Sequence, residues 1–310
     1  MSEPLIVLSG ATASGKSAAA LCLAERIGGE IVSADSMQVY RGMNIGTGKP
    51  DAECRRRVPH HLIDVVWPWE GFSAQRFVQG ASAAIADIRR RGRVPLVVGG
   101  TGLYIRALTE GLFEGPSADW ALRNRLVALA ERYGTRHLHR RLAQVDPAAA
   151  DAIHPNDLRR IVRALEVHEK TGRPISGEQR QFDRPEAARQ RQLFILDRRR
   201  ADLYARIDRR VERMMAEGWL EETRQLLADP AGLGREASQA LGYRELAEHL
   251  VGRLPLEETV EVIKRHTRQF AKRQLSWFRR LADARWVAAA PEDTPEVLAE
   301  RLHALLRPQD

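Results

Sequence analysis

The chain has 310 residues, a net charge of +8 and two cysteines, Cys22 and Cys54. Its length predicts one large domain or two modest ones, and two isolated cysteines without neighbouring metal ligands argue against a disulfide scaffold or a structural zinc site. No apolar run approaches the roughly 18 residues of a membrane span, and no signal-peptide pattern is visible at the N-terminus, so we expect a cytoplasmic protein.

The positive charge is carried almost wholly by arginine, because only five of the 49 basic residues are lysine. Arginine favours bidentate contacts with phosphate, and a strongly positive balance favours a polyanionic partner such as nucleic acid. An arginine excess can also follow from genomic base composition, and the count alone does not separate the two explanations. Aromatic residues make up 6% of the chain and give no separate sign of a base-stacking surface.

The first predicted element is an apolar strand at 5–8 that runs directly into a glycine-rich loop. The loop fits G-x-x-x-x-G-K-[ST] and lies between this strand and a predicted helix at 17–26. In such a P-loop, backbone N–H groups and the positive end of the helix hold phosphate oxygens. We expect Lys16 to reach the terminal phosphate of a di- or triphosphate and the Ser17 hydroxyl to hold Mg²⁺. The predicted phosphate-binding residues are Gly10, Ala11, Thr12, Ala13, Ser14, Gly15, Lys16 and Ser17.

A carboxylate, Asp35, follows the second predicted strand at 30–33. The carboxyl ends of parallel strands line one crevice, so we expect Asp35 to lie near Lys16 and Ser17. Three roles remain open for this side chain. It can be an outer ligand of Mg²⁺, a general base within about 2.6–3.2 Å of the proton that it removes, or the cap of a turn or helix.

Two further segments precede the next helix. Residues 46–50 are rich in glycine and predict a flexible loop that could close over a ligand. His60 and His61 come just before a predicted strand at 62–66 and suggest a metal site. Adjacent side chains on a strand point to opposite faces, so we expect a structural role for both.

A predicted helix at 74–91 leads to a strand at 95–98 that ends in the loop Gly99-Gly100-Thr101-Gly102. P-loop ATPases and GTPases usually place an acidic Mg²⁺ ligand at the end of another core strand. This loop offers backbone N–H groups and the Thr101 hydroxyl instead. The sequence also lacks the N-K-x-D signature of G proteins and the adjacent aspartate pairs of prenyl chain-elongating enzymes. These gaps weaken an interpretation as an NTP-hydrolysing enzyme.

From about residue 116 to 190 the sequence is rich in arginine, alanine and leucine and has helical period without a strand pattern. A strand at 193–196 then returns. The simplest architecture is an α/β core formed by residues 1–115 and 191–310, with a parallel sheet and a mostly helical insertion at 116–190. The remaining predicted helices are 203–217, 220–227, 243–250, 256–281 and an amphipathic helix after Pro291.

The long helix at 256–281 has two distinct faces. An apolar set predicts the face toward the core, and we expect Trp277 to pack there as well. Lys264, Arg268 and Lys272 recur four residues apart on another face and could track an RNA backbone. The predicted core residues of this helix are Val260, Ile263, Phe270, Phe278 and Leu281.

Taken together in order, these motifs resemble one family over nearly the whole length, the P-loop tRNA prenyltransferases known as tRNA dimethylallyltransferases. Ala11 stands where the family usually has proline and Gly48 where alanine is frequent, and we expect little change in function from either. The matching blocks are Gly10–Ser17, Asp35–Met43 with Ile45–Pro50, Pro59–Asp64, Gly99–Tyr104, His154–Asp157 with Arg163–Val167, Gly242–Arg244, and Thr267–Gln269 with Ala271–Leu275 and Trp277.

The resemblance implies a P-loop NTPase-like sheet with an inserted, mostly helical tRNA-binding domain and C-terminal helices. The implied reaction transfers a dimethylallyl group from dimethylallyl diphosphate to N6 of the adenosine at tRNA position 37, next to the anticodon. Its products are N6-(dimethylallyl)adenosine and diphosphate. Mg²⁺ is the implied cofactor and the tRNA anticodon stem-loop the implied partner, and we expect a monomer that is not bound to a membrane.

The resemblance also implies roles for individual residues. Asp35 is the implied general base, Thr101 a second contact to the reacting base or the leaving group, and Arg206 an additional ligand of the diphosphate. Ser36, Met37 and Gln38 would line the site of the extruded adenine. The implied tRNA contacts in the insertion are Arg123, Arg159, Arg160, Ile161, Val162 and Arg163.

Two other classes of function compete with this interpretation. A P-loop small-molecule kinase would bind and consume ATP and would not need a basic helical insertion. A nucleotide-regulated RNA-binding protein would bind tRNA without forming a product, and its binding would survive replacement of Asp35.

Overall fold

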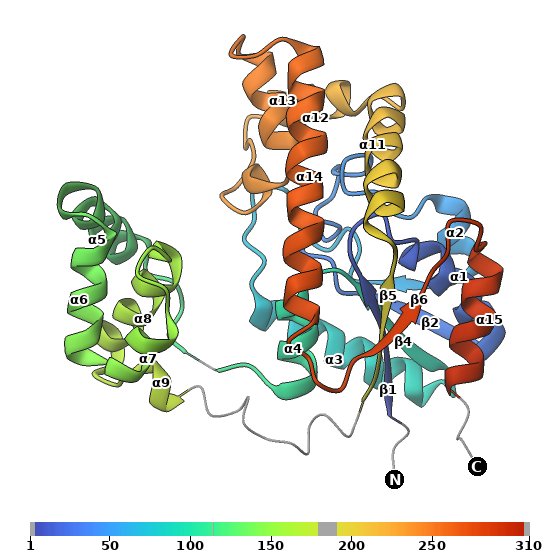
Figure 1. The fold of residues 1–310 in the computed structure, drawn as a ribbon, viewed down its shortest axis with the longest axis horizontal. Helices are drawn as coiled ribbons and strands as arrows, with labels where there is room; N and C mark the ends of the chain where they lie inside the picture. The colour runs from blue at the N-terminus through green and yellow to red at the C-terminus, as the bar shows by residue number, and fades with distance from the viewer. Residues whose placement is uncertain (1–3, 114, 179–190, 307–310) are drawn as a thin grey trace. The chain divides into compact units, whose positions relative to one another are not determined.

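The computed structural model describes residues 4–113, 115–178 and 191–306 (Figure 1). The chain forms two compact units, Met1–Thr109 with Glu186–Asp310, and Glu110–Pro185. The sequence analysis places the insertion at 116–190, so its expected boundaries lie a few residues further along the chain, the second one outside the described residues.

The larger unit is built on a six-stranded parallel sheet with strand order β3-β2-β4-β1-β5-β6. This arrangement confirms the predicted parallel α/β core and four of the five predicted strands. The strands are β1 (Leu5–Gly10), β2 (Gly29–Ser33), β3 (His60–His61), β4 (Val94–Gly99), β5 (Arg191–Asp197) and β6 (Arg285–Ala288).

The prediction of the remaining strand, at 62–66, is wrong. The strand in this region is β3, two residues earlier and only two residues long. Leu62 and Asp64 have φ angles of 62° and 57°, a left-handed backbone that turns the chain and cannot continue a strand. Val66 forms only an isolated bridge with Tyr40.

Both faces of the sheet are covered by helices, which explains why the central strands β1 and β4 are largely apolar on both faces. Leu8, Leu96 and Phe194 pack on one face under α1 and α15. Val7, Val97 and Ile195 alternate with them and pack on the other face under α3, α4 and the end of α14. The helices of this unit are α1 (Lys16–Ile27), α2 (Ala52–Arg57), α3 (Ala74–Arg90), α4 (Gly102–Glu110), α11 (Arg200–Ala216), α12 (Trp219–Ala228), α13 (Tyr243–Leu250), α14 (Leu256–Phe278) and α15 (Pro295–Leu306), with a 3₁₀ turn at Ala237–Gln239.

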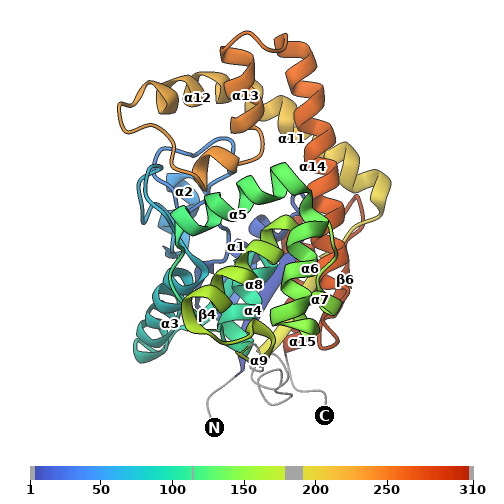
Figure 2. The same cartoon turned by 90° about the vertical axis from the view of Figure 1, so that its left-hand side faces the viewer.

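The C-terminal helices build a second layer beyond the carboxyl ends of the strands. In Figures 1 and 2, α11 leads away from the carboxyl end of β5 and packs along α14, α13 lies beside the amino end of α14, and α12 lies beside α13. Their apolar side chains, including Met214, Trp219 and Tyr243, pack against Val39 and Tyr40 from the loop after β2. The helices predicted at 17–26, 74–91, 203–217, 220–227, 243–250 and 256–281 and after Pro291 are all confirmed, whereas α2, α4 and β6 were not predicted.

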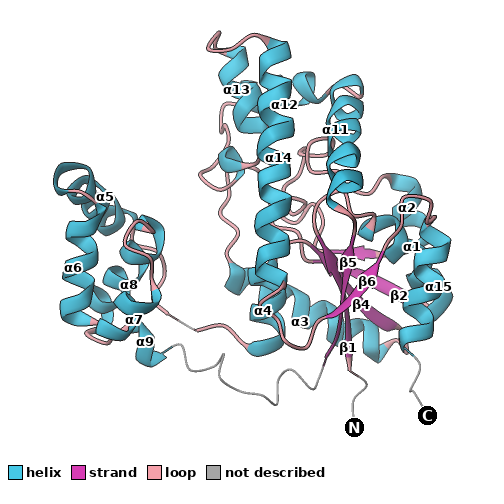
Figure 3. Ribbon diagram, in the orientation of Figure 1, coloured by secondary structure: helices cyan, strands magenta, loops and turns pink. Residues whose placement is uncertain are grey.

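The smaller unit consists of helices, and its described residues contain no strand (Figure 3). Its core is formed by aliphatic side chains such as Leu126, Leu142, Ile161 and Leu165. The Asp157 side chain caps α8 by accepting a hydrogen bond from the Arg160 N–H at 3.2 Å. The helices are α5 (Trp120–Tyr133), α6 (Thr135–Val145), α7 (Pro147–Ala152), α8 (Leu158–Thr171) and α9 (Ile175–Glu178).

Candidate active site

The predicted phosphate loop joins β1 to α1 with the backbone geometry of an anion-binding nest. Ala13 and Gly15 have φ angles of 62° and 95°, and such left-handed residues turn successive N–H groups into one concavity. Gly10 permits a close approach of β5, because a Cβ there would lie 3.0 Å from the Leu196 carbonyl oxygen. The Ser14 hydroxyl is buried and has no hydrogen-bond partner among the described residues.

Two arginines hold the opposite side of this loop. The Nε atom of Arg198 donates to the Ser14 carbonyl oxygen at 2.8 Å, and the Nε atom of Arg206 donates to the Ala13 carbonyl oxygen at 3.0 Å. The two carbonyl oxygens thus face the guanidinium groups. Two N–H groups of the loop also have partners within the protein: that of Thr12 donates to Gln274 Oε1 at 2.9 Å, and that of Ser14 donates to the Ala11 carbonyl oxygen at 3.2 Å. Arg206 thus contacts the phosphate loop itself and is not among the residues that line the cavity, and its expected role as a ligand of the diphosphate stays a prediction.

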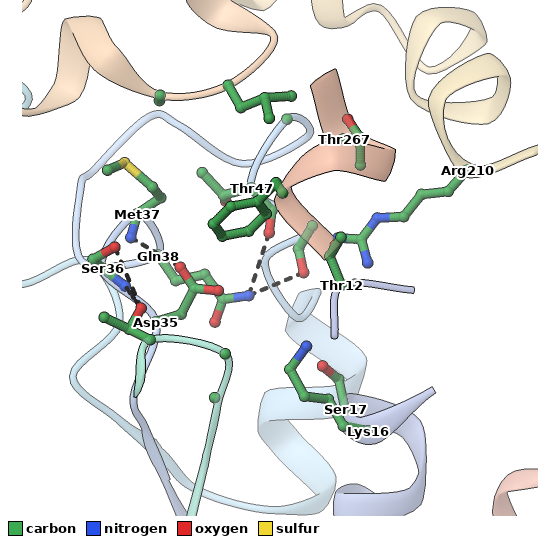
Figure 4. A pocket seen from close by; sticks show the side chains of 18 of the residues that line it. Thr12, Lys16, Ser17, Asp35, Ser36, Met37, Gln38, Thr47, Arg210 and Thr267 are labelled. Atoms are coloured by element: carbon green, nitrogen blue, oxygen red, sulfur yellow. Dashed lines mark hydrogen bonds between the residues drawn. The ribbon is translucent and has the colours of Figure 1, made fainter. Parts of the chain in front are cut away.

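A cavity of about 720 Å³ lies in front of the loop, at the carboxyl ends of β1, β2 and β4. Lys16, Ser17 and Asp35 all line it (Figure 4), as their places at the strand ends predict. Desolvation lowers the pKa of Lys16 from 10.5 to about 8, although the Asp35 carboxylate acts to raise it. The negative charge of Asp35 thus favours the protonated form of Lys16.

Arg210 is a cavity residue that the sequence analysis missed. It lies one helical turn after Arg206 on α11, and its side chain points into the cavity (Figure 4). Burial lowers its pKa, and the Asp35 carboxylate opposes this shift. Its spacing of four residues from Arg206 is the signal that could have found it.

Backbone hydrogen bonds tie the Asp35 segment to the glycine-rich loop after β4. The Thr101 N–H donates to the Ala34 carbonyl oxygen at 3.2 Å, and the Ser36 N–H donates to Thr101 Oγ1 at 3.1 Å. Gly99 is required here, because a Cβ would lie 2.1 Å from the Ala34 carbonyl oxygen. Asp35 Oδ1 accepts a hydrogen bond from the Met37 N–H at 2.9 Å. This bond fixes the carboxylate and does not involve its other oxygen.

Gln38 and the loop at 44–48 form one wall of the cavity. Gln38 Nε2 donates to the Gly48 carbonyl oxygen at 3.2 Å. Glu222 on α12 accepts hydrogen bonds from the N–H groups of Asn44 and Ile45, each at 2.9 Å, and from that of Gly46 at 3.3 Å. The loop expected to be flexible is thus bonded in place at its start.

The rest of the cavity wall comes mainly from the C-terminal helices and combines apolar side chains with polar and charged ones such as Arg244, His266 and Arg273. Phe270 lines the cavity and is 39% exposed, so its predicted place in the core is wrong. Ile263 and Phe278 are buried as predicted, and Trp277 packs against the core beside Gly102. Apolar lining residues include Met37, Ile207, Val211, Met214, Trp219 and Phe270.

The basic face predicted on α14 is largely neutralised. Lys264 pairs with Glu212 and Glu261, each at 2.8 Å, and Arg268 pairs with Asp208 at 2.5 Å. Lys272 remains exposed. The expectation that all three residues track an RNA backbone is therefore not supported by their surroundings.

The implied tRNA contacts of the insertion divide into two groups. Arg159 and Arg160 are exposed on α8, whereas Ile161 and Val162 are buried in the core of this unit. The side chains of these two apolar residues are therefore not placed for a surface contact.

Arg123 and Arg163 both bind the buried carboxylate of Glu166, with N–O distances of 2.7 and 2.6 Å. Burial acts to raise the pKa of Glu166, but hydrogen bonds from Arg123, the Asp119 N–H and Arg163 outweigh burial and lower it. Both arginines thus have a structural role that the sequence analysis did not foresee.

The histidine pair is structural, as expected. His60 Nδ1 lies 2.7 Å from the Val58 carbonyl oxygen, and His61 Nε2 lies 2.7 Å from the Glu30 carboxylate. No cluster of three or more histidine, cysteine, aspartate or glutamate residues capable of holding a metal occurs among the described residues. Within the same residues, no helix has the length and apolar character needed to cross a membrane.

Comparisons with known proteins agree on one family. The IPP transferase family model matches residues 38–281, and an isopentenyl transferase model matches residues 4–59. The tRNA dimethylallyltransferase of Geobacter metallireducens is 54% identical over 286 residues, covering 91% of this chain and 92% of that protein. That of Anaeromyxobacter dehalogenans strain 2CP-C is 51% identical over 96% of this chain and 98% of its own length.

Solved structures of related proteins have the same fold. The full-length tRNA isopentenylpyrophosphate transferase of Bacillus halodurans is 40% identical, with a TM-score of 0.71, over 98% of this chain and 97% of that one. A eukaryotic dimethylallyltransferase acting on tRNA is 30% identical, with a TM-score of 0.80, over 97% of this chain and 78% of that one. Both likenesses extend through the P-loop core and the insertion.

Proposed function

The chain belongs to the IPP transferase family, and we propose that it transfers a dimethylallyl group from dimethylallyl diphosphate to N6 of the adenosine at tRNA position 37. One observation carries the proposal. A single cavity is lined by the cations Lys16 and Arg210, which suit a diphosphate, and by the carboxylate of Asp35, which suits a proton acceptor.

The donor side of the reaction needs stabilisation of a leaving diphosphate. As the bond between C1 and the diphosphate oxygen breaks, negative charge builds on the diphosphate and partial positive charge on C1. The loop is held by hydrogen bonds from Arg198 and Arg206, and Lys16 and Arg210 line the cavity beside it. Donors that are arranged before the reaction are an effective way to stabilise such charge. The orphaned Ser14 hydroxyl would gain a partner from a phosphate oxygen.

Mg²⁺ fits the same place. The Ser17 hydroxyl lines the cavity beside Lys16, and Mg²⁺ is usually bound through one or two protein oxygens together with substrate phosphates. A bound Mg²⁺ would neutralise charge on the leaving diphosphate. Lys16 and Arg210 act on the same group, so the protein and the ion would share this task.

The acceptor side needs a group that removes a proton from adenine N6. This exocyclic amine is a weak nucleophile, so a hydrogen bond to Asp35 would raise its reactivity. The N6–C1 bond forms, the C1–O bond breaks, and the N6 proton passes to the Asp35 carboxylate. The Met37 N–H holds Asp35 Oδ1, and Thr101 braces the same segment through Ser36.

The cavity suits two reactants together. Its volume of about 720 Å³ lies in the upper part of the common range for small-molecule sites, about 300–1,000 Å³. The apolar wall of Met214, Trp219 and Phe270 would accept the dimethylallyl group. An adenine that is unstacked from a single-stranded loop would enter beside Met37 and Gln38, at a cost of a few kcal/mol.

The exposed arginines Arg159 and Arg160 of the insertion are the residues there that would contact the anticodon stem-loop. All described lining residues of the cavity come from one unit of one chain, which supports an active monomer. A tRNA substrate and the lack of a membrane-spanning helix among the described residues support a cytoplasmic location.

A transfer assay tests the proposed function. The protein would be incubated with Mg²⁺, unmodified bulk tRNA and dimethylallyl diphosphate that carries a label in the prenyl group. We expect the label to appear on adenosine of the tRNA. A parallel incubation with γ-labelled ATP tests the kinase alternative, and ATP consumption without prenyl transfer would refute the proposal.

A further inference from the structure

An exposed pair of stacked indole rings lies outside the cavity, in the loop after β3. The rings of Trp67 and Trp69 are nearly parallel, with an interplanar angle of 4° and centroids 5.1 Å apart. Trp67 is 45% exposed and Trp69 is 39% exposed. We call this pair the tryptophan stack. Its exposure is unusual, because indole rings are normally well buried in a folded chain.

A cation closes one end of the tryptophan stack. The Arg41 guanidinium lies 5.1 Å from the ring centroid of Trp67, and its Nε atom is fixed by donating to the Asp64 carbonyl oxygen at 2.9 Å. In the described part of the chain, Trp69 has no further ring or cation contact, and neither indole N–H donates a hydrogen bond. The outer face of Trp69 is therefore the end of the stack that neither another ring nor a cation covers among the described residues.

The backbone under the tryptophan stack is rigid. Pro68 fixes its own φ angle, and its carbonyl oxygen accepts the Gly234 N–H at 2.9 Å. Gly234 lies so close that a Cβ would be 2.8 Å from the Trp69 carbonyl oxygen. Glu70 closes a turn by accepting the Trp67 N–H at 2.7 Å. A preformed aromatic surface of this kind loses little side-chain entropy when a ligand binds.

The tryptophan stack is joined directly to the wall of the cavity. The Arg41 N–H donates to the Val66 carbonyl oxygen at 2.8 Å, next to Trp67 in sequence. Arg41 is three residues after Gln38, which lines the cavity, and three residues span at most about 11 Å. The stack thus lies within reach of an RNA loop whose reacting base occupies the cavity.

We propose that the tryptophan stack binds a second unpaired nucleobase of the same tRNA loop, against the outer face of Trp69. The inference rests on the proposed function and goes beyond it by adding a contact outside the reacting adenosine. Bases of single-stranded RNA are recognised largely by stacking on aromatic rings, with support from arginine. The flat open ring, the adjacent cation and the net positive charge of the chain suit this ligand.

The proposal is tested by replacing Trp69 and measuring tRNA binding and steady-state transfer. We expect Trp69→Ala to weaken tRNA binding by about 5- to 100-fold, the range for loss of one stacked base, with the KM for dimethylallyl diphosphate unchanged. Trp69→Phe should retain most of the affinity. Trp286→Ala is the matched control, because Trp286 is 37% exposed on β6 at the opposite edge of the sheet.

Abasic substitution in the RNA identifies the bound base. An abasic nucleotide at the stacking position should weaken binding to the wild-type protein but not to Trp69→Ala. Equal tRNA affinity of Trp69→Ala and wild type would overturn the proposal, as would a loss of affinity that the Trp286→Ala control shares. If the wild-type protein were a dimer and Trp69→Ala a monomer, the stack would serve self-association, and the proposal that it binds a nucleobase would be refuted. If wild type failed to prenylate tRNA at all, the proposed function itself would fail.

Discussion

Lys16 and Arg210 show how the fold changes the chemistry of single residues. Both cations lie in the cavity with the Asp35 carboxylate, and desolvation lowers the pKa of each. The P-loop pattern alone locates Lys16 in the sequence. No sequence motif marks Arg210, because its position in the cavity depends on how α11 is rotated relative to the loop. The residue expected to bind the diphosphate from this helix was Arg206, one turn earlier.

The pKa of Lys16, lowered to about 8, predicts a pH dependence of donor binding. The ammonium is protonated below pH 8 and loses its charge as the pH rises through this value, so the KM for dimethylallyl diphosphate should rise above pH 8. In Lys16→Arg the charge persists to far higher pH, and the KM should be flat over the same range. Steady-state kinetics from pH 6.5 to about 9.5 measure both. Parallel profiles for the two proteins would refute the assignment.

The same shift has the opposite effect on stability. Between pH 8 and 10.5 the unfolded chain binds the Lys16 proton more strongly than the folded chain does. The free energy of unfolding therefore gains a contribution that increases with pH across this window. Ligand affinity and stability should thus move in opposite directions.

Replacing Arg210 tests its assignment to the leaving group. We expect Arg210→Ala to lower the rate of transfer by about 10²- to 10³-fold, the usual effect of removing one prearranged donor. Arg209→Ala is the control on the same helix, because Arg209 is exposed and does not line the cavity. Single-turnover transfer rates distinguish the two. A rate for Arg210→Ala within threefold of wild type would contradict the assignment.

At the scale of elements, hydrophobic pattern predicted the buried strands and the long helices well. It failed where backbone geometry or side-chain partners decide the outcome. The apolar run at 62–66 resembles a strand, but the left-handed residues Leu62 and Asp64 turn it. The short edge strand β6 has only one buried residue and gives no clear pattern.

The sequence also shows where the cations are but not which residues pair with them. Arg123 and Arg163 are bound to the buried Glu166, and Lys264 and Arg268 are paired with acidic residues from α11 and α14. Pairing partners far apart in sequence cannot be found without the fold.

Glu222 on α12 holds the cavity loop by accepting hydrogen bonds from the backbone N–H groups of residues 44–46. Hydrogen bonds to a charged acceptor contribute about 1.5–3 kcal/mol, so Glu222→Ala should release residues 44–46. We expect hydrogen exchange of these amides to accelerate by at least about tenfold and the KM for tRNA to rise. Glu221→Ala is the neighbouring control, since Glu221 is exposed and pairs only locally with Arg224. Unchanged exchange at residues 44–46 would show that the loop is held by other contacts.

At the scale of the molecule, the P-loop core places Lys16 and Ser17 at the cavity, and the C-terminal helices add Arg210 and apolar side chains to its wall. The loops after β2 and β4 add Asp35 and Thr101 to the same cavity. These segments come from widely separated parts of the sequence. Their motifs predicted correctly that Lys16, Ser17 and Asp35 lie close together. The apolar wall depends on packing of α11, α12 and α14 and was not predicted.

The central claim is that Asp35 takes the N6 proton in a cavity that also binds the donor. The most direct measurement is single-turnover prenyl transfer by Asp35→Asn, with tRNA affinity determined in parallel. We expect a rate lowered by about 10²- to 10⁴-fold, with tRNA affinity within a few-fold of wild type. A rate within about threefold of wild type would show that proton removal does not depend on this carboxylate, and Asp35 would then not be the base.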